Sequence, residues 1–327
     1  MKLVPQNRFL LFLALLLWGG ALLTEKPWEG GAHERTSSLV GPLFPELQRQ
    51  RQEIDQIQLR SQGEEVTLLR TSTGFVVKEK WGHPASSTRV VQLIDSLSLL
   101  DNRDVVSTNP EKRTTFGVEK GSGTQILVQN SRGEILADLI GGKLRAADPF
   151  TAAQVRLDFY VRPSGRNEVF LVNAYQPPST EASDWLAGDL FSLNAEDIAL
   201  ASRLEFTSGE TWTLVHDGPE AWHMENPEPR DIDLYEGDSW AFSFSNLRAS
   251  DVWAHLEQGE TPSPEFGFST NLFRVEMGQG KPLELRLGGL APNSDRYAWV
   301  VGSEWIYSVP NHEVDQLCMP FSVVSED

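Results

Sequence analysis

Residues 97–105 read LSLLDNRDV, and residues 244–252, which lie 147 positions later, read FSNLRASDV. Each segment places an apolar residue and a serine ahead of an Asp-Val pair, and four other pairs of segments recur at almost the same offset. These pairs are Thr73–Val77 with Glu220–Met224 at 147, Leu139–Gly142 with Arg286–Gly289 at 147, Val66–Leu68 with Trp212–Leu214 at 146, and Phe116–Gly117 with Phe266–Gly267 at 150. Because five matches in one order are hard to obtain by chance, the sequence predicts two copies of one structural unit.

The first copy alternates predicted strands with one helix. Polar turns that contain glycine separate short apolar runs, a pattern typical of β-hairpins. The expected strands are Ile57–Arg60, Val66–Leu69, Phe75–Lys78, Gln125–Gln129, Glu134–Ile140, Phe159–Arg162 and Glu168–Val172. Between the third and fourth of these strands, the Ser86-Ser87-Thr88 cluster precedes apolar residues at helical spacing, which predicts a helix from Val90 to Leu100.

The second copy repeats this order. Its expected strands are Arg203–Thr207, Trp212–His216, Trp222–Glu225, Leu272–Met277, Leu283–Leu287, Tyr297–Val301 and Trp305–Val309, with a helix near Asp238–Gln258. Antiparallel hairpins with a helix against one face make an α+β layer. We therefore expect an α+β fold with one N-terminal transmembrane helix, followed by two tandem antiparallel-sheet units, each with one packed helix.

The N-terminal region carries a membrane-targeting segment. Residues 9–23 read FLLFLALLLWGGALL and hold no charge. A helix of this length covers roughly 22 Å, less than the roughly 30 Å hydrocarbon layer of a bilayer, so a cleaved signal peptide competes with a permanent anchor. The residues after Gly20 offer no convincing cleavage site, which favours an anchor, and Lys2 and Arg8 place the N-terminus in the cytoplasm. We expect the bulk of the chain to be periplasmic or extracytoplasmic, held at the inner (cytoplasmic) membrane.

Six segments follow from these patterns. They are a cytoplasmic stub and transmembrane anchor (1–28), a tether (29–53), the first α+β repeat (54–176), a bridge (177–197), the second α+β repeat (198–316) and a C-terminal tail (317–327). Leu43, Phe44 and Leu47 near the end of the tether are apolar, so we expect this part to dock on the first repeat.

The charge of the chain excludes several classes of protein. The chain has 28 Lys and Arg against 46 Asp and Glu, a net charge of −18, which repels phosphate backbones and excludes nucleic acid as the main partner. Its single cysteine, Cys318, excludes an internal disulfide and sites that need several thiolates.

The acidic excess belongs to the second copy. Residues 1–180 hold 21 basic and 19 acidic residues, whereas residues 181–327 hold 7 and 27, together with seven of the ten tryptophans. Solubility and core packing account for such a composition. An acidic surface with exposed aromatics that selects a basic or polar partner accounts for it as well.

Sequence strings that mark common catalytic sites do not occur. The chain has no G-x-S-x-G and no Walker G-x-x-x-x-G-K-[ST], and His33-Glu34 is not followed by the second histidine of H-E-x-x-H. If a transporter is involved, its ATPase is therefore expected to be another chain.

Two clusters resemble metal sites. His216, His223 and Glu225 would offer a metal two imidazoles and a carboxylate, although polar alternation on a half-exposed strand also accounts for them. The acids Asp231, Asp233, Glu236 and Asp238 fail the calcium-loop spacing, because Tyr235 occupies a ligand position, so a solvated acidic turn is favoured. We expect no catalytic residue, no metal site and no cofactor.

Several motifs occur together in one known family. They are Leu43-Phe44-Pro45, Ile54 with Ile57, Gly63 before Val66-Thr67-Leu68, Trp81-Gly82-His83-Pro84-Ala85, Phe116-Gly117-Val118, Ile140-Gly141-Gly142, Tyr160-Val161-Arg162, and Trp185-Leu186 before Leu190-Phe191. From Leu43 to Val309 the chain resembles a bacterial family of unknown function whose members are membrane-anchored, duplicated, β-rich proteins. Such proteins are often encoded beside ABC transporter components of the gliding and auxiliary-transport (GldG-like) type. The resemblance rests on structural glycines and aromatics, so it implies an architecture and carries no catalytic residue.

Together these features predict a non-catalytic, membrane-anchored extracytoplasmic protein that works by binding through strand edges and acidic faces. The resemblance implies that its partners are transporter subunits, so we expect an accessory protein of an ABC-transporter-associated envelope assembly. The alternative is a module that binds envelope glycans or peptides through its tryptophans. An extracytoplasmic hydrolase built on scattered acids is the least favoured reading.

Overall fold

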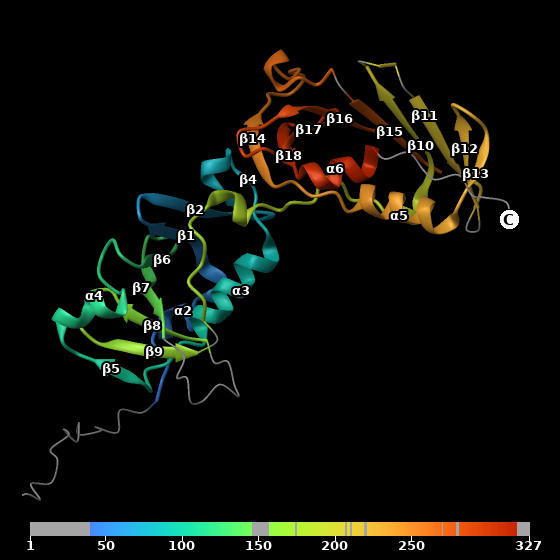
Figure 1. Cartoon of the computed structure of the whole chain (residues 1–327). Coiled ribbons are helices and arrows are strands. Elements are labelled where there is room, and N and C mark those ends of the chain that lie inside the picture. Colours follow the sequence, from blue (N-terminus) through green and yellow to red (C-terminus); the bar gives the residue numbers. More distant parts are fainter. Residues whose placement is uncertain are drawn as a thin grey trace, which may run out of the picture. The chain divides into compact units, whose positions relative to one another are not determined.

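In the part of the chain that the structure describes, the strands form two antiparallel sheets of nine strands each (Figure 1). A computed structural model describes residues 40–145, 157–173, 175–206, 208–209, 211–218, 221–269, 271–278 and 281–318. Both sheets belong to one compact unit that begins at Pro42. The described part of the chain is mostly β, with a few helices.

The first repeat contains the first sheet. Its strands are β1 (Ile54–Ser61), β2 (Glu64–Thr71), β3 (Gly74–Val77), β4 (His83–Pro84), β5 (Val105–Ser107), β6 (Thr124–Asn130), β7 (Ile135–Leu144), β8 (Asp158–Pro163) and β9 (Val169–Asn173). They are ordered β4-β3-β2-β1-β6-β7-β8-β9-β5 across the sheet. Hairpins between consecutive strands make most of these pairs, as the glycine-containing turns predict.

The second repeat contains the second sheet. Its strands are β10 (Ile198–Glu205), β11 (Thr211–His216), β12 (Trp222–Asn226), β13 (Arg230–Ile232), β14 (Asp251–His255), β15 (Asn271–Met277), β16 (Leu283–Leu290), β17 (Arg296–Val300) and β18 (Trp305–Val309). Their order is β13-β12-β11-β10-β15-β16-β17-β18-β14, which repeats the order of the first sheet strand for strand. The prediction of two copies of one unit is confirmed.

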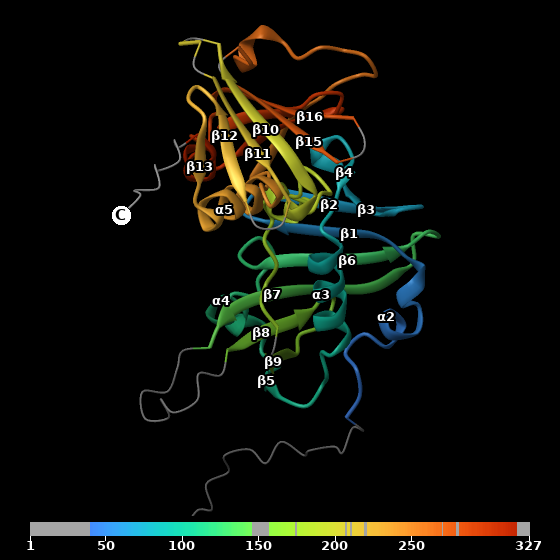
Figure 2. The ribbon, with the colours of Figure 1, turned by 90° about the vertical axis from the view of Figure 1, so that its right-hand side faces the viewer.

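One helix of twelve residues occupies the same place in each repeat. These helices are α3 (Ser87–Ser98) and α5 (Leu234–Ser245), and Figure 2 shows α3 lying across the strands β6 to β8. The buried residues of α3 are Val90, Leu93, Ile94 and Leu97, and those of α5 are Gly237, Trp240, Ala241 and Phe244. Each residue of the second set lies 147 positions after one of the first, so the two helices bury the same face in the same register.

Shorter helical elements connect and extend the sheets. The α-helices are α2 (Pro45–Arg49), α4 (Arg113–Phe116) and α6 (Asn311–Cys318), and the 3-10 helices are η1 (Arg51–Glu53), η2 (Lys78–Lys80), η3 (Pro110–Lys112), η4 (Ala182–Trp185), η5 (Ala195–Asp197) and η6 (Pro264–Phe266). Helix α6 packs beside α5 in the second repeat (Figure 1). Burial of Cys318 at its end raises the pKa of that thiol.

The end of the expected tether docks on the first repeat as predicted. Leu43, Phe44 and Leu47 are buried in its core, and the backbone N–H of Leu43 donates to the carbonyl of Leu100 at 2.8 Å. In the expected bridge, the N–H of Ser86 donates to the carbonyl of Trp185 at 2.7 Å, so η4 lies against the start of α3.

Two glycines allow close approach of a loop to each sheet. A Cβ atom added to Gly142 in β7 would fall well under 3.0 Å from the carbonyl oxygen of Phe116, and one added to Gly288 in β16 would fall as close to that of Phe266. The structure thus makes Gly142 and Gly288 equivalent. The constant offset of 147 read from the sequence pairs Gly142 with Gly289 and is wrong here by one residue.

The sequence prediction missed two short strands in each repeat. They are β4 and β5 in the first and β13 and β14 in the second, none longer than five residues. The second helix was placed near Asp238–Gln258, whereas α5 runs from Leu234 to Ser245 and β14 occupies Asp251–His255. These strands add to the seven strands and one packed helix expected for each unit, so each repeat is mostly β where the structure describes it.

The expected transmembrane anchor lies outside the described residues. Within the described ranges, none of the helices combines the length and the apolar character that crossing a membrane requires.

Candidate functional site

A large cleft opens beside helix α5 in the second repeat. It has a volume of about 1090 Å³ and lies between η5, the ends of β11 and β15, and α5. Its wall includes Glu196, Asp197, His216, Asp238, Phe242 and Met277, and we call it the acidic cleft. Carboxylates and apolar side chains therefore face the same space.

The three carboxylates of the acidic cleft are exposed. The indole Nε1 of Trp222 donates to Asp238 at 2.8 Å, and the amide of Asn194 donates to Asp197 at 3.1 Å. These neutral donors orient the carboxylates and leave their charge uncompensated. The wall of the cleft includes no lysine or arginine among the described residues, so its potential is negative.

His216 lines the acidic cleft, and two contacts fix its ring. Its ring stacks on Trp222 with centroids 4.0 Å apart, and its Nδ1 lies 3.1 Å from the carbonyl oxygen of Ile198. A carbonyl only accepts, so Nδ1 carries the proton in this contact. The other ring nitrogen, Nε2, is buried without a hydrogen-bond partner among the described residues.

The first repeat has the same scaffold at this place. Paired strands make Arg70 equivalent to His216 and Phe75 equivalent to Trp222. The guanidinium of Arg70 lies over the ring of Phe75, 4.6 Å from its centroid, and Arg70 Nε donates to the carbonyl of Ile54. The stacked pair and its backbone contact are thus parts of the repeated fold.

At this place the two repeats differ in an ion pair. In the first repeat Arg51 of η1 pairs with Asp95 of α3. At the equivalent positions the second repeat has Ala195 and Phe242, which cannot form such a pair. Without such a pair the space in front of η5 stays open, and the acidic cleft occupies it.

The structure separates the histidines that we considered as metal ligands. In the register of β11 and β12, His216 lies opposite Trp222 and His223 lies opposite Val215, so the two imidazoles lie on opposite faces of the sheet. His223 instead approaches Asp217 at 2.5 Å and Glu225 at 3.9 Å. Across the described ranges, no group of three His, Cys, Asp or Glu side chains is arranged to hold a metal ion.

The acids near the start of α5 serve the helix. Asp233 is the N-cap, and its Oδ1 accepts from the backbone N–H groups of Tyr235 at 2.9 Å and Glu236 at 3.3 Å. The spacing of Asp233 and Glu236 is that of a capping box, a sequence signal for the start of this helix. Asp238, one turn further on, reaches the acidic cleft.

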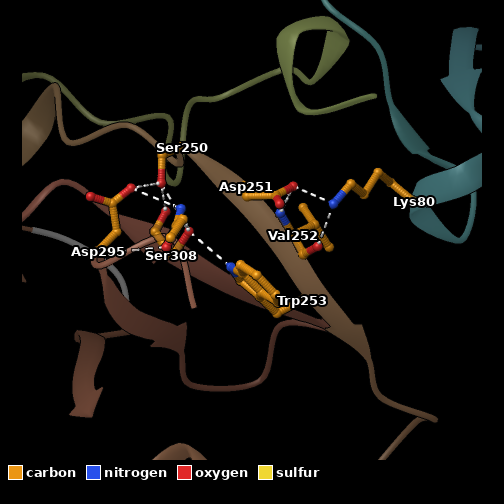
Figure 3. A network of polar contacts seen from close by, with 8 residues as sticks. Lys80, Ser250, Asp251, Val252, Trp253, Asp295 and Ser308 are labelled. Carbon is orange, nitrogen blue, oxygen red and sulfur yellow. Dashed lines mark hydrogen bonds and ion pairs between the residues drawn. The ribbon is translucent and has the colours of Figure 1, made fainter. Parts of the chain in front are cut away.

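A second polar cluster joins β14 to the η2 segment. Lys80 Nζ lies 2.6 Å from Asp251 Oδ1 and donates to the carbonyl of Val252 at 3.2 Å (Figure 3). Nearby, Ser250 Oγ donates to Asp295 at 2.5 Å, and Trp253 Nε1 donates to Ser308 Oγ at 3.0 Å. Lys80 and Asp251 lie 171 positions apart and share no motif, so this cluster could not be predicted from the sequence.

We expect Lys80→Met to lower the free energy of unfolding by about 1–2 kcal/mol, because Asp251 would keep a largely buried charge without its cation. The side chains of Lys80 and Asp251 are only 19% and 15% exposed. Urea unfolding of the full chain measures the effect. The matched control is Lys78→Met on the exposed neighbour, with a change within about 0.5 kcal/mol. Equal losses for both variants would contradict a role for the Lys80–Asp251 pair.

His83 packs as a neutral ring against the second sheet. It is 4% exposed, and its centroid lies 5.0 Å from that of Trp305 and 5.8 Å from that of Tyr307. Burial lowers the pKa of His83 below its ordinary 6.5, against a smaller opposing effect of its bond to the carbonyl of Pro84. The unfolded chain therefore binds a proton on His83 at a higher pH than the folded chain does.

This shift predicts an acid-sensitive contribution to stability. As the pH falls below 6.5, protonation of His83 favours the unfolded chain. Between pH 7.5 and 5.5 the free energy of unfolding should therefore fall by up to about 1.4 kcal/mol more in the native protein than in the His83→Phe variant. Urea unfolding at a series of pH values measures the difference. His312→Gln changes an exposed histidine and should leave the pH dependence as it is. If the free energy of unfolding varied with pH in the same way in the native protein and in His83→Phe, the prediction would be refuted.

Comparison with known proteins identifies the family and adds no relative of known activity. Searches of curated proteins and of solved structures gave no match. One family description, "Domain of unknown function (DUF4340)", matches residues 76–265, from β3 in the first sheet to η6 in the second repeat. Because this match covers more than half of the chain, the protein belongs to the DUF4340 family of domains of unknown function.

Proposed function

We propose that the chain is a non-catalytic binding protein, and that its acidic cleft holds a basic, partly apolar segment of a partner protein. The observation that carries the proposal is the composition of the cleft wall. Glu196, Asp197 and Asp238 present negative charge beside the apolar side chains of Phe242 and Met277.

Such a wall complements lysine and arginine side chains. Their methylene stems cover apolar surface while their charged ends remain free to meet carboxylates. Phe242 is 64% exposed although it belongs to a helix with a well-buried face, so it provides apolar area for contact. Uncompensated carboxylates also repel acidic partners and accelerate encounter with basic ones.

In this proposal the chain and its partner are both anchored in the cytoplasmic membrane. The apolar segment 9–23 would anchor the chain in the cytoplasmic membrane with its N-terminus inside and the two repeats outside. A partner in the same membrane, such as a subunit of an ABC transporter, then meets the cleft at high effective concentration, so modest contacts suffice. The family resemblance supports this choice of partner.

Site-specific crosslinking in intact membranes tests the proposal. A photoreactive benzoylphenylalanine replaces Phe242 in the cleft, and in a second protein it replaces Asp95, the equivalent residue of the first repeat. We expect position 242 to form an adduct with one defined membrane protein, through a basic segment outside the cytoplasm, and position 95 to form none. Neutralising the cleft with Glu196→Gln, Asp197→Asn and Asp238→Asn should reduce that adduct at least five-fold.

Other outcomes would overturn the proposal. Equal adducts at positions 242 and 95 would show that the cleft has no special role. An adduct that glycosidases remove, and proteases do not, would favour the alternative of an envelope glycan-binding module. An adduct that survives neutralisation of the three carboxylates would show that charge does not select the partner.

A further inference from the structure

A second cleft lies on the other face of the second sheet. It has a volume of about 530 Å³ and is lined by Phe206, Ser263, Phe268, Arg286, Trp299 and Val301, among others; we call it the aromatic cleft. Arg286 in β16 stands between Leu285 and Leu287, which are fully buried in the core beneath α5. Because side chains alternate along a strand, Arg286 faces away from that core.

Among the described residues, Arg286 has no counterion within ion-pair distance. Its cross-strand neighbours are Leu272 and Trp299, both apolar, and its Nε is buried without a hydrogen-bond partner among the described residues. Glu284, two residues earlier on the same face, lies 3.9 Å from Arg274 and so belongs to another ion pair. A guanidinium with this surrounding retains hydrogen-bond donors that a ligand can use.

The first repeat has an apolar residue at the position of Arg286. Strand pairing makes Ile140 equivalent to Arg286. Ile140 is buried against Val118 and Val169 in a small apolar cluster. The second repeat therefore has a charged side chain at a position where the first repeat has isoleucine.

The first repeat has an arginine near this position, Arg162, and its guanidinium is bound by backbone carbonyls of the same repeat. Arg162, equivalent to Trp299, donates from Nε to the carbonyl of Val118 and from Nη1 to that of Arg166, both at 3.0 Å. Within the part of the chain that the structure describes, Arg286 makes no hydrogen bond of this kind. The contrast separates a structural arginine from one that is available for binding.

We propose that the aromatic cleft binds a small carboxylate that carries a ring or a comparable apolar body. The planar fork of a guanidinium matches a carboxylate with two parallel hydrogen bonds. The exposed ring of Phe206 and the half-buried ring of Phe268 offer apolar surface for the remainder of the ligand. This site differs from the acidic cleft in position and in charge, and it does not depend on the proposed function.

Ligand-observed fluorine NMR on the full chain tests the inference, with 4-fluorophenylacetate as the probe and its neutral amide as the control ligand. We expect saturable binding of the carboxylate and at least ten-fold weaker binding of the amide. Arg286→Ile, which restores the residue of the first repeat, should abolish carboxylate binding. Arg286→Lys keeps the charge without the planar fork and should retain part of it.

A matched variant separates charge in the cleft from charge elsewhere. Lys281→Gln removes an exposed cation just before β16 and should leave the affinity within two-fold. Thermal melting shows whether each variant is folded. If Arg286→Ile does not fold, binding by Arg286→Lys still tests the role of the guanidinium. Equal binding of acid and amide, equal loss with Lys281→Gln, or unchanged binding in both Arg286 variants would overturn the inference.

Discussion

Replacing Gly237 with valine is expected to lower the free energy of unfolding by about 3 kcal/mol, since overpacking alone costs about 1–3 kcal/mol and a buried hydrogen bond is also disturbed. Any Cβ at Gly237 would fall well under 3.0 Å from three carbons of the Trp222 ring. That ring is 1% exposed, is stacked on His216, and donates to Asp238 at 2.8 Å, so it has little freedom to move. Chemical denaturation of the full chain measures the loss.

The first repeat supplies the rescue for this variant. It has Val90 at the position of Gly237 and Phe75 at the position of Trp222, so a smaller ring accompanies the larger helix residue. The double variant Trp222→Phe with Gly237→Val should therefore recover at least about 1 kcal/mol of the summed losses. Ser239→Val on the exposed face of α5 serves as the control and should cost less than about 1 kcal/mol. Additive losses in the double variant would contradict the repeat-based explanation.

Alanine at Gly142 or at Gly288 is expected to cost about 2–3 kcal/mol in each case. The obstacle is a backbone carbonyl oxygen, of Phe116 in one repeat and of Phe266 in the other, and it cannot rotate away as a side chain does. Unfolding free energies of the two single variants should agree to within about 1 kcal/mol, because the same contact recurs in both sheets.

Gly289 provides the control for this pair. A Cβ there would lie 3.8 Å from the nearest carbonyl oxygen, an ordinary contact, so Gly289→Ala should change stability by less than about 1 kcal/mol. The sequence offset of 147 makes Gly289 the partner of Gly142, whereas the strand register selects Gly288. A large loss for Gly289→Ala and a small one for Gly288→Ala would support the offset and contradict the register.

The duplication was predictable because its signal is spread over many positions. The strands of the larger hairpins were found from alternation and from glycine-containing turns. The short strands β4 and β5 were missed because two or three residues are too few to show a period. The start of α5 was missed because Trp240, Phe242 and Phe244 alternate with small residues as they would in a strand, although the capping residues Asp233 and Glu236 were present.

The binding clefts could not be predicted in the same way. The acidic cleft depends on the loss of the Arg51–Asp95 pair at Ala195 and Phe242, residues that lie 47 positions apart and carry no motif. Only the strand register shows that these two positions correspond to an ion pair in the other copy. The uneven charge of the two halves set the second repeat apart, but it indicated no position within that repeat.

The most direct test of the account is isothermal titration calorimetry of the full chain with a peptide of alternating lysine and leucine. The native protein should bind it, and the affinity should fall as salt is raised, because exposed charges are screened. The double variant Ala195→Arg with Phe242→Asp, which restores the ion pair of the first repeat and fills the acidic cleft, should bind at least ten-fold more weakly, a change of about 1.4 kcal/mol. Undiminished affinity in this variant, with its melting temperature unchanged, would contradict the assignment of the acidic cleft as the binding site.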